Sequence, residues 1–319
     1  MALSLILAFL LSVLANWMMV RGRAWLPQDK PNTRSLHVHA VPRSGGVGIV
    51  LGVGVACLIL PTWRLQIMLG LAVSIAVLSL LDDARGLPVW LRLGSHLAVA
   101  LAFLWFYVPA EWGAMAWLLA LLAMVWMTNL YNFMDGSDGL AGGMALFGFG
   151  ALGTAAWLAG DIVMAQLGLS VAAAAAGFLL FNFYPAKIFM GDVGSIPLGF
   201  MAAAIGLLGY WRELWPWMFP VLVFSPFIVD ASVTLLRRLL RGERVWQAHR
   251  EHYYQRLIRS GVSHRATAIG AYGLMSGCAT VAFYSLRRPE SALPAVLLLG
   301  VLYLALMIWL DRRWSLHEA

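Results

Sequence analysis

About eleven segments of roughly 16 to 23 mostly apolar residues follow one another along this chain, separated by short polar stretches. A helix needs about 20 apolar residues to cross a bilayer. Hydrophobic residues make up 61% of the 319 residues and charged residues only 12%, far from the balance of a soluble domain. The sequence therefore predicts an all-α, polytopic integral membrane protein, with residues 1–319 as a single membrane-embedded domain. The predicted helices cover residues 2–20, 44–61, 65–81, 93–109, 112–134, 139–159, 162–184, 193–210, 214–236, 266–286 and 291–310.

The basic residues predict the orientation. No basic residue precedes the first helix, and Arg21 and Arg23 follow it, which is the reverse of the charge order of a secretory signal. We therefore expect a retained helix with its N-terminus outside and the C-terminus in the cytoplasm. In this orientation 18 of the 22 Lys and Arg residues lie on the inner side, as the positive-inside rule requires. The four on the outer side are Arg64, Arg212, Arg287 and Arg288.

The net charge of +7 needs no nucleic-acid partner. The insertion rule and attraction to anionic membrane lipids account for it, and no aqueous segment is long enough to form a nucleic-acid-binding domain. Cys57 and Cys278 lie singly in apolar runs, so we expect packing residues rather than a disulfide or zinc site. The Ala-rich stretch 172–176 favours close helix packing. The sequence leaves a homodimer open.

Aspartates at the ends of apolar segments are the main functional signal. An ionised carboxylate at membrane depth costs about 3 kcal/mol, so repeated acids predict an active site. Asp82 and Asp83 end a predicted helix, where the helix dipole disfavours acids and the two charges repel. They make sense beside a cation or a cationic side chain, and Arg85 and Arg92 follow. All five of the aspartates fall on the predicted inner side: Asp82, Asp83, Asp135, Asp138 and Asp192.

Two further segments combine acids, amides and glycines. In the first, Asn129, Asn132, Asp135 and Asp138 are spaced by three, so that each is the next one's neighbour on a helix. Oxygen ligands of this kind suit Mg²⁺, which is held by one or two carboxylates plus substrate phosphates. In the second, Asp192 lies between Gly191 and Gly194 and could cap a helix or bind a metal.

Two basic loops predict anion binding. The loop 21–43 carries Arg34, His37, His39 and Arg43, and Arg43 precedes a glycine-rich helix start that suits a phosphate. In the loop 237–265, His249 and His252 have a metal-like spacing, but the surrounding arginines favour a polyanion such as a diphosphate. Asp230 is assigned equally to the site or to an ion pair with Arg237 or Arg238.

Five motifs resemble a known family. They read PNTRSLHVHAVPRSGG, LDDARGL, NLYNFMDGSDGLAGG, FNFYPAKIFMGDVGSIPLGF and AHREHYYQRL, in this order over residues 29–257. This pattern is similar to that of the polyprenyl-phosphate N-acetylhexosamine-1-phosphate transferases, the glycosyltransferase 4 family. The resemblance implies transfer of a sugar 1-phosphate from a UDP-N-acetylhexosamine to undecaprenyl phosphate, with release of UMP, at the cytoplasmic face of a bacterial inner membrane.

The resemblance also implies roles for individual residues. Asp192 matches the family's Mg²⁺ ligand, with Mn²⁺ as the alternative ion, and the active site is formed by the loops 21–43, 82–92, 129–138, 185–192 and 237–265. The expected catalytic residues are Asp82, Asp83, Asp135 and Asp138. The expected substrate-binding residues are Arg43, Arg92, Asn129, Asn132, Asn182, Lys187, His249, Arg250 and His252.

Two departures from the family pattern bear on the substrate. The peptidoglycan branch has consecutive histidines where this chain reads His249-Arg250-Glu251-His252, which argues against a muramyl-pentapeptide substrate. The form resembles the branch that begins O-antigen or capsule units with N-acetylglucosamine or a 6-deoxy amino sugar such as N-acetylfucosamine or N-acetylquinovosamine. Trp90 replaces a common basic residue, leaving Arg92 for its role. The alternatives are a cation-coupled transporter, whose acids would lie near mid-membrane, and a lipid-binding scaffold.

Overall fold

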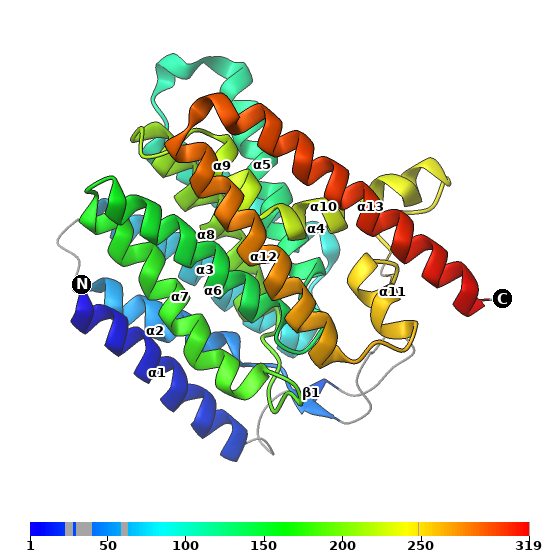
Figure 1. The fold of residues 1–319 in the computed structure, drawn as a ribbon. Coiled ribbons are helices and arrows are strands. Elements are labelled where there is room, and N and C mark those ends of the chain that lie inside the picture. Colours follow the sequence, from blue (N-terminus) through cyan, green and yellow to red (C-terminus); the bar gives the residue numbers. More distant parts are fainter. Residues whose placement is uncertain (23–27, 30–39, 59–62, 248, 319) are drawn as a thin grey trace.

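The computed structural model describes residues 1–22, 28–29, 40–58, 63–247 and 249–318, and it is almost entirely helical (Figure 1). The elements are α1 (Ala2–Arg21), β1 (Gln28–Asp29), β2 (Val41–Pro42), α2 (Gly46–Leu58), α3 (Trp63–Arg85), α4 (Val89–Tyr107), η2 (Ala110–Trp112), α5 (Gly113–Phe133), α6 (Leu140–Leu158), α7 (Ile162–Asn182), α8 (Asp192–Trp211), α9 (Met218–Val223), α10 (Ser225–Leu240), α11 (Tyr253–Arg259), α12 (His264–Arg287), η3 (Pro289–Ser291) and α13 (Ala292–Glu318).

Within the described ranges, nine helices are long and apolar enough to cross a membrane. They are α1, α3 to α8, α12 and α13, and they confirm the all-α, polytopic membrane class. The count of about eleven is not reached. The predicted segment 44–61 is helical over Gly46–Leu58, and its residues 59–61 lie outside the described residues. The segment 214–236 is divided between α9 and α10, because Pro226, which has no N–H to donate, begins a new helix in its first turn.

The helices around the acidic pair differ from the predicted bounds. α3 continues through Asp82 and Asp83 to Arg85 and ends at Gly86, whose φ of +68° suits glycine. Pro88 then precedes α4, which begins at Val89, four residues before the predicted start at 93. The two aspartates therefore lie in the last turn of a helix, and the connection to α4 is tight.

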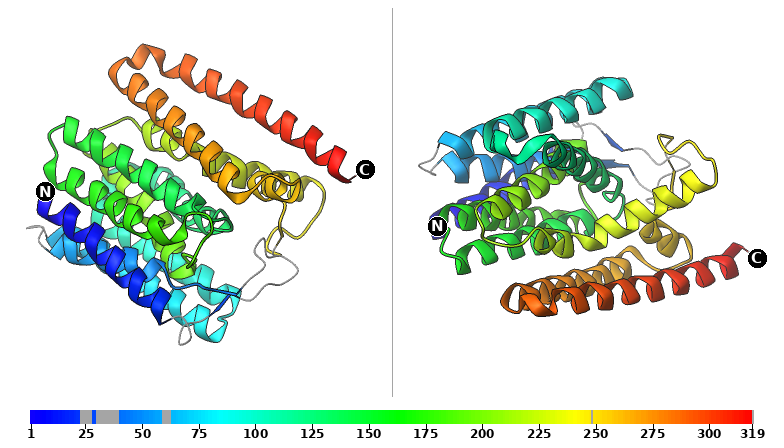
Figure 2. Two further views of the ribbon diagram at one scale, coloured as in Figure 1. Left: turned by 60° about the horizontal axis from the view of Figure 1, so that its bottom comes forward. Right: turned by 90° about the horizontal axis from the view of Figure 1, so that it is seen from above.

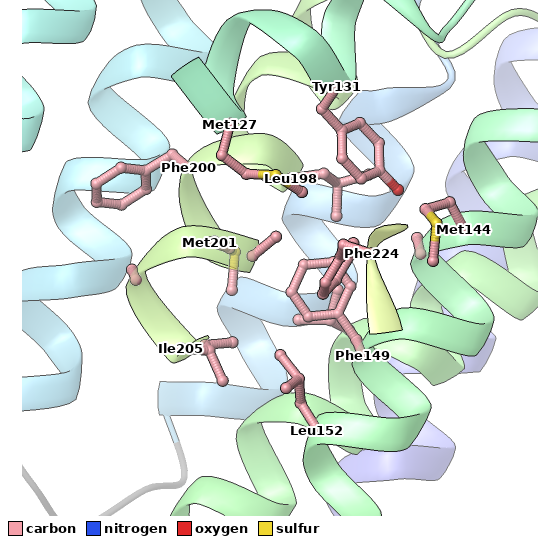
Figure 3. Packing of buried hydrophobic residues seen from close by; sticks show 14 of the residues in the cluster. Met127, Tyr131, Met144, Phe149, Leu152, Leu198, Phe200, Met201, Ile205 and Phe224 are labelled. Atoms are coloured by element: carbon pink, nitrogen blue, oxygen red, sulfur yellow. The ribbon is translucent and has the colours of Figure 1, made fainter. Parts of the chain in front are cut away.

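The packing is built around α6, α7 and α8. In the left view of Figure 2, α1 and α2 cover one side of α7, while α12 and α13 form the opposite edge of the molecule. α8 lies between α3 and α5. Figure 3 shows Phe149 of α6 beside Phe224, with Met201 of α8 near them, whereas Phe200 points away and contacts Phe103 of α4; all of these side chains are buried. The expected close packing of the alanine-rich stretch is confirmed by Ala174 and Ala175, which are fully buried.

One end of the bundle collects the polar segments. β1 and β2 form an antiparallel pair in which Gln28 lies opposite Pro42 and Asp29 opposite Val41. The Phe189 N–H donates to the Pro42 carbonyl (2.7 Å), and the Gly45 and Gly46 N–H groups donate to the carbonyls of Phe189 (2.9 Å) and Met190 (2.8 Å). These bonds join the first loop to the segment that enters α8.

Candidate active site

Asp192 lies at the first position of α8, and Gly191 is the residue that caps the helix. The Asp192 carboxylate does not serve as the cap. Its Oδ1 accepts a hydrogen bond from the Asn132 side chain (2.9 Å), which also donates to Ser195 Oγ (3.0 Å). The last turn of α5 therefore orients the acid at the start of α8. Ser195 was not assigned from sequence, and its own hydroxyl donates to the Gly191 carbonyl (3.2 Å).

Asp83 faces the same point from α3. Its Oδ1 pairs with Arg43 Nη2 at 2.9 Å, and its Oδ2 is buried and makes no hydrogen bond to the described part of the chain. A buried carboxylate oxygen without a donor is costly, so it marks a position that a cation or ligand would satisfy. Gly191, with a φ of +71°, lets the Arg43 backbone approach, because an added Cβ would lie 2.3 Å from the Arg43 carbonyl oxygen and 3.3 Å from Asp83 Oδ2.

Asp135 follows α5 and completes the acidic group. Its pKa is raised to about 8, mainly by burial and then by the charges of Asp192 and Asp83, while a hydrogen bond from the Gly191 backbone opposes the rise. Asp29 on β1 acts in the same direction. Asp29 lies two residues before the first motif and was not assigned from sequence, because only the pairing of β1 with β2 brings it here. We call Asp83, Asp135 and Asp192 the carboxylate cluster.

Asp82 is placed differently from its neighbour. Its Oδ1 accepts a hydrogen bond from the Leu87 N–H (2.6 Å), and its Oδ2 pairs with Arg92 Nη1 (3.1 Å). Both oxygens thus hold the connection between α3 and α4, and Arg92 is fixed beside the cluster. Asn129, one turn before Asn132 on α5, donates to the Val125 carbonyl of its own helix (2.7 Å) and also hydrogen-bonds to His96 of α4.

Asp138 and Asn182 bind other parts of the protein. Asp138 Oδ2 accepts from the Ala186 N–H (3.0 Å), and its Oδ1 lies 3.6 Å from His264 Nδ1. Asn182 accepts from the Gly139 N–H and donates to the Ile188 carbonyl, both at 3.0 Å. These contacts tie the 135–139 turn to the loop that enters α8, in which the Lys187 side chain is exposed. The direct roles predicted for Asp138, Asn182 and Lys187 in catalysis or substrate binding stay predictions. His264 was not assigned from sequence.

The short helix α11 covers the 133–136 turn. Tyr254 Oη donates to the Phe133 carbonyl (3.2 Å) and would lie 2.2 Å from a Cβ added at Gly136. The His252 ring is buried and stacked on Phe133, with 6.2 Å between ring centroids. His252 thus lies in the packing between α11 and this turn, and its predicted role in substrate binding stays a prediction.

His249 and Arg250, which precede α11 in the last loop, differ in charge. His249 lies 4.8 Å from His252 by ring centroids, and burial lowers its pKa to about 4, with the charges of His252 and Arg238 adding to the effect. It is therefore neutral near pH 7. Arg250 is half-buried next to it.

Asp230 has a role that neither sequence alternative described. Its two oxygens accept the backbone N–H groups of Tyr253 (2.9 Å) and Tyr254 (3.0 Å), so it caps α11 from α10. Arg237 pairs instead with Asp311 (2.9 Å), and Arg238 pairs with Glu243 (2.7 Å). No local sequence signal could reveal this cap, because 23 residues separate Asp230 from Tyr253.

The carboxylate cluster fits a magnesium ion completed by a ligand. Among the residues that the structure describes, no group of three or more His, Cys, Asp or Glu side chains is arranged to hold a metal ion by itself. Mg²⁺ does not require such a group, since it keeps several waters and uses one or two carboxylates plus substrate phosphates. The unpaired Asp83 Oδ2 and the raised pKa of Asp135 both indicate excess negative charge that a cation would relieve.

Comparisons with known proteins identify the family. The glycosyl transferase family 4 model matches residues 65–210, which contain the whole carboxylate cluster. A probable undecaprenyl-phosphate N-acetylglucosaminyl 1-phosphate transferase of Bacillus subtilis is 34% identical over 262 residues, which cover 76% of this chain and 73% of that protein. The chain belongs to glycosyl transferase family 4.

Other relatives extend over more of this family 4 protein. The undecaprenyl-phosphate alpha-N-acetylglucosaminyl 1-phosphate transferase of Escherichia coli O157:H7 is 26% identical over 314 residues, 90% of this chain and 84% of its own. A phospho-N-acetylmuramoyl-pentapeptide-transferase of Levilactobacillus brevis is 27% identical over 281 residues, 78% and 86% of the two chains. The family resemblance is confirmed, and the O-antigen or capsule branch stays a prediction.

Proposed function

We propose that this family 4 protein transfers an N-acetylhexosamine 1-phosphate from a UDP-sugar to undecaprenyl phosphate. The observation that carries the proposal is the carboxylate cluster, to which α3, the 133–136 turn and α8 each contribute one acid, with Arg43 and Arg92 beside it. Acids that can hold a divalent cation, next to arginines that can bind phosphate oxygens, suit phosphoryl transfer. The names of the B. subtilis and E. coli relatives describe the same kind of reaction.

The reaction needs no proton to be removed from the acceptor. A phosphate oxygen of undecaprenyl phosphate attacks the β-phosphorus of the UDP-sugar, and the bond from that phosphorus to the bridging oxygen breaks, so that UMP leaves. A phosphate monoester is largely dianionic near pH 7. We therefore assign positioning and charge control, rather than general-base catalysis, to the acids. Of the adjacent pair, Asp83 is the better candidate for this positioning role, because both oxygens of Asp82 are already bonded within the protein.

The proposal includes Mg²⁺, with Mn²⁺ as the alternative ion. Asp192, Asp83 and Asp135 are the residues that would hold it, and Asn132 fixes the Asp192 carboxylate for that purpose. When bound, the ion would spread the charge that develops on the diphosphate. Arg43 and Arg92 stay beside the cluster through their pairs with Asp83 and Asp82, where their guanidinium groups can bind the remaining phosphate oxygens.

The proposed donor is UDP-N-acetylglucosamine or a 6-deoxy form such as UDP-N-acetylfucosamine or UDP-N-acetylquinovosamine, for O-antigen or another surface polysaccharide. The names of the B. subtilis and E. coli relatives support N-acetylglucosamine. The sequence His249-Arg250-Glu251-His252 supports a donor without a peptide, although the L. brevis relative makes the pentapeptide donor a necessary comparison. We place the site at the cytoplasmic face of a bacterial inner membrane, on the distribution of basic residues.

A donor panel tests the proposal. The purified protein is incubated with undecaprenyl phosphate, Mg²⁺ and one donor at a time: UDP-N-acetylglucosamine, a 6-deoxy UDP-N-acetylhexosamine, UDP-N-acetylmuramoyl-pentapeptide or UDP-glucose. We expect UMP and a lipid-linked sugar with N-acetylhexosamines only, and no product in EDTA. Product with the pentapeptide donor would overturn the substrate proposal. Absence of UMP with every donor would overturn the enzyme proposal in favour of a transporter or scaffold.

A further inference from the structure

The helix α11 has two faces with different surroundings. Tyr254 and the buried His252 that caps the helix contact the 133–136 turn and so face the carboxylate cluster. Tyr253, Arg256 and Arg259 are spaced by three, which places them on one face of the helix. That face meets α10 and α13: Arg256 pairs with Asp311 (2.7 Å), and the guanidinium groups of Arg256 and Arg259 lie 5.4 Å and 4.5 Å from the Trp314 ring centroid.

A basic cavity of about 410 Å³ lies on this second face. Its lining includes four arginines, from α10, α11 and the residue after α10: Arg237, Arg241, Arg256 and Arg259. Glu251 is the acid in the lining, and Asp311 pairs with Arg237 and Arg256. Glu243, outside the lining, pairs with Arg241 (2.7 Å), so four cations face three acids, and the remaining positive charge favours an anionic group. Guanidinium groups bind phosphate oxygens through two parallel hydrogen bonds.

An apolar cavity of about 390 Å³ adjoins the basic one and shares Tyr253 with it. It is lined mainly by α10, α11, α12 and α13, with Leu257, Leu306 and Leu310 among its side chains, and it also reaches Met134 and Leu140. α13 passes along both cavities. Leu306 and Leu310 belong to its apolar span, and Trp314 follows one turn later, where an aromatic residue marks the membrane interface. The two cavities thus offer a charged end and an apolar end at the depth of a lipid head group.

We infer that these two cavities together bind one anionic phospholipid. The phosphate lies among the arginines, and one acyl chain enters the apolar cavity beside α13. Basic pockets between membrane helices are suited to anionic head groups. The lipid would fill the space between α10, α11 and α13 and so hold the far face of α11, while the near face covers the 133–136 turn. The basic cavity, where the phosphate would lie, has no lining residue in common with the carboxylate cluster, and the inference does not depend on the proposed reaction.

Native mass spectrometry of the full chain tests this inference. The protein is purified in a mild detergent and titrated with phosphatidylglycerol or phosphatidylcholine. We expect one tightly bound phosphatidylglycerol and at least tenfold weaker binding of phosphatidylcholine, which has no net charge. The double variant Arg256→Gln/Arg259→Gln should weaken phosphatidylglycerol at least tenfold. The matched control Arg244→Gln/Arg265→Gln removes the same charge from exposed positions outside the lining and should bind as the wild type does.

The apolar cavity is tested without changing charge. Gly270 of α12 lines it, and the space around its Cβ position is open, so Gly270→Leu should occupy the cavity and weaken binding of phosphatidylglycerol several-fold. Gly277→Leu, at another open position of α12 outside the lining, is the control. Unchanged binding in both the arginine and Gly270 variants would overturn the site. Displacement of the lipid by inorganic phosphate at equal concentration would show a simple anion site and overturn the phospholipid assignment.

Discussion

The adjacent residues Asp82 and Asp83 have different partners at the candidate site. Asp82 and Asp83 are about 100° apart around α3, because an α-helix has 3.6 residues per turn. Asp82 points to Leu87 and Arg92 and fixes the connection to α4, whereas Asp83 points to Arg43 and the carboxylate cluster. A single step along the helix thus separates a residue that holds the connection to α4 from one that faces the carboxylate cluster.

The removal of one charge tests the metal assignment. Asp192→Asn keeps the shape of the side chain but loses the carboxylate, so we expect turnover to fall at least 100-fold while the protein stays folded, with UMP release and thermal unfolding as the measurements. Asp161→Asn is the control, because Asp161 caps α7 and pairs with Arg212 away from the cluster, and asparagine caps as well as aspartate. Near-wild-type activity of Asp192→Asn at limiting Mg²⁺ would refute the assignment.

The raised pKa of Asp135 predicts a pH dependence of stability. In the folded protein its pKa is about 8, well above the usual value of 3.8, so the native state binds more protons than the unfolded state between these values. Stability of the metal-free protein should therefore fall as pH rises from about 4 to about 8. The thermal midpoint in EDTA should show this loss in the wild type, Asp135→Asn should reduce it, and Mg²⁺ should offset it. An identical pH slope in Asp135→Asn and wild type would contradict the electrostatic account.

At the scale of elements, small residues decide which helix ends meet. A Cβ added at Gly46 would lie 2.3 Å from Gly194 Cα, so the start of α2 and the first turn of α8 touch backbone to backbone. The hydrogen bonds from Gly45 and Gly46 to Phe189 and Met190 depend on the same approach. This contact, rather than any property of Arg43 itself, places the guanidinium beside Asp83.

A pair of glycine variants in α2 tests this contact. Gly46→Ala should push α2 from α8 and cost about 1–3 kcal/mol of stability, as overpacking does. Because Arg43 moves with α2, turnover should fall further than stability alone explains, and the KM of a phosphate-bearing substrate should rise. Gly54→Ala in the same helix adds a methyl group to open space and should leave both unchanged. Equal KM values for the two variants would show that this contact does not position Arg43.

At the scale of the whole molecule, the polar segments share one end of the bundle. The ends of α3 and α5 and the start of α8 bring together residues more than 100 positions apart, and α11 closes over them. Arg212 and Asp161 pair at another helix boundary, between α8 and α7. An active site built at one end must face one side of the membrane, and the basic residues predict the cytoplasmic side.

Thiol labelling tests that orientation. In a chain whose Cys57 and Cys278 are replaced by alanine, a cysteine at Gly242 should be protected from an impermeant maleimide in intact cells and should react after permeabilisation. A cysteine at Glu213, after α8, should react in intact cells. Glu213 and Gly242 both have positive φ values, which indicates tight turns at helix ends. The reverse pattern would place the site outside the cytoplasm and refute a cytoplasmic donor.

The sequence alone determined the class, the main helices and the acids of the site. Burial in lipid requires long apolar runs, and a charge at the end of such a run costs free energy. Both features can therefore be recognised directly in the composition and order of the residues. For the same reason Asp83, Asp135 and Asp192 stand out one by one, and the five motifs are sufficient to indicate the family. The interrupted segment 214–236 was misjudged because apolar content does not reveal where a helix restarts.

Only the tertiary structure decided which partner each polar group has. Contacts between distant segments made Asp230 a cap for α11, turned His252 into a packing residue, brought Asp29 toward Asp83 and left Asp138 and Asn182 bonded to the backbone. They also placed Arg256 and Arg259 on the face of α11 that meets α13. The type of a residue determines its chemistry, but its partners depend on which residues come close together when the helices pack.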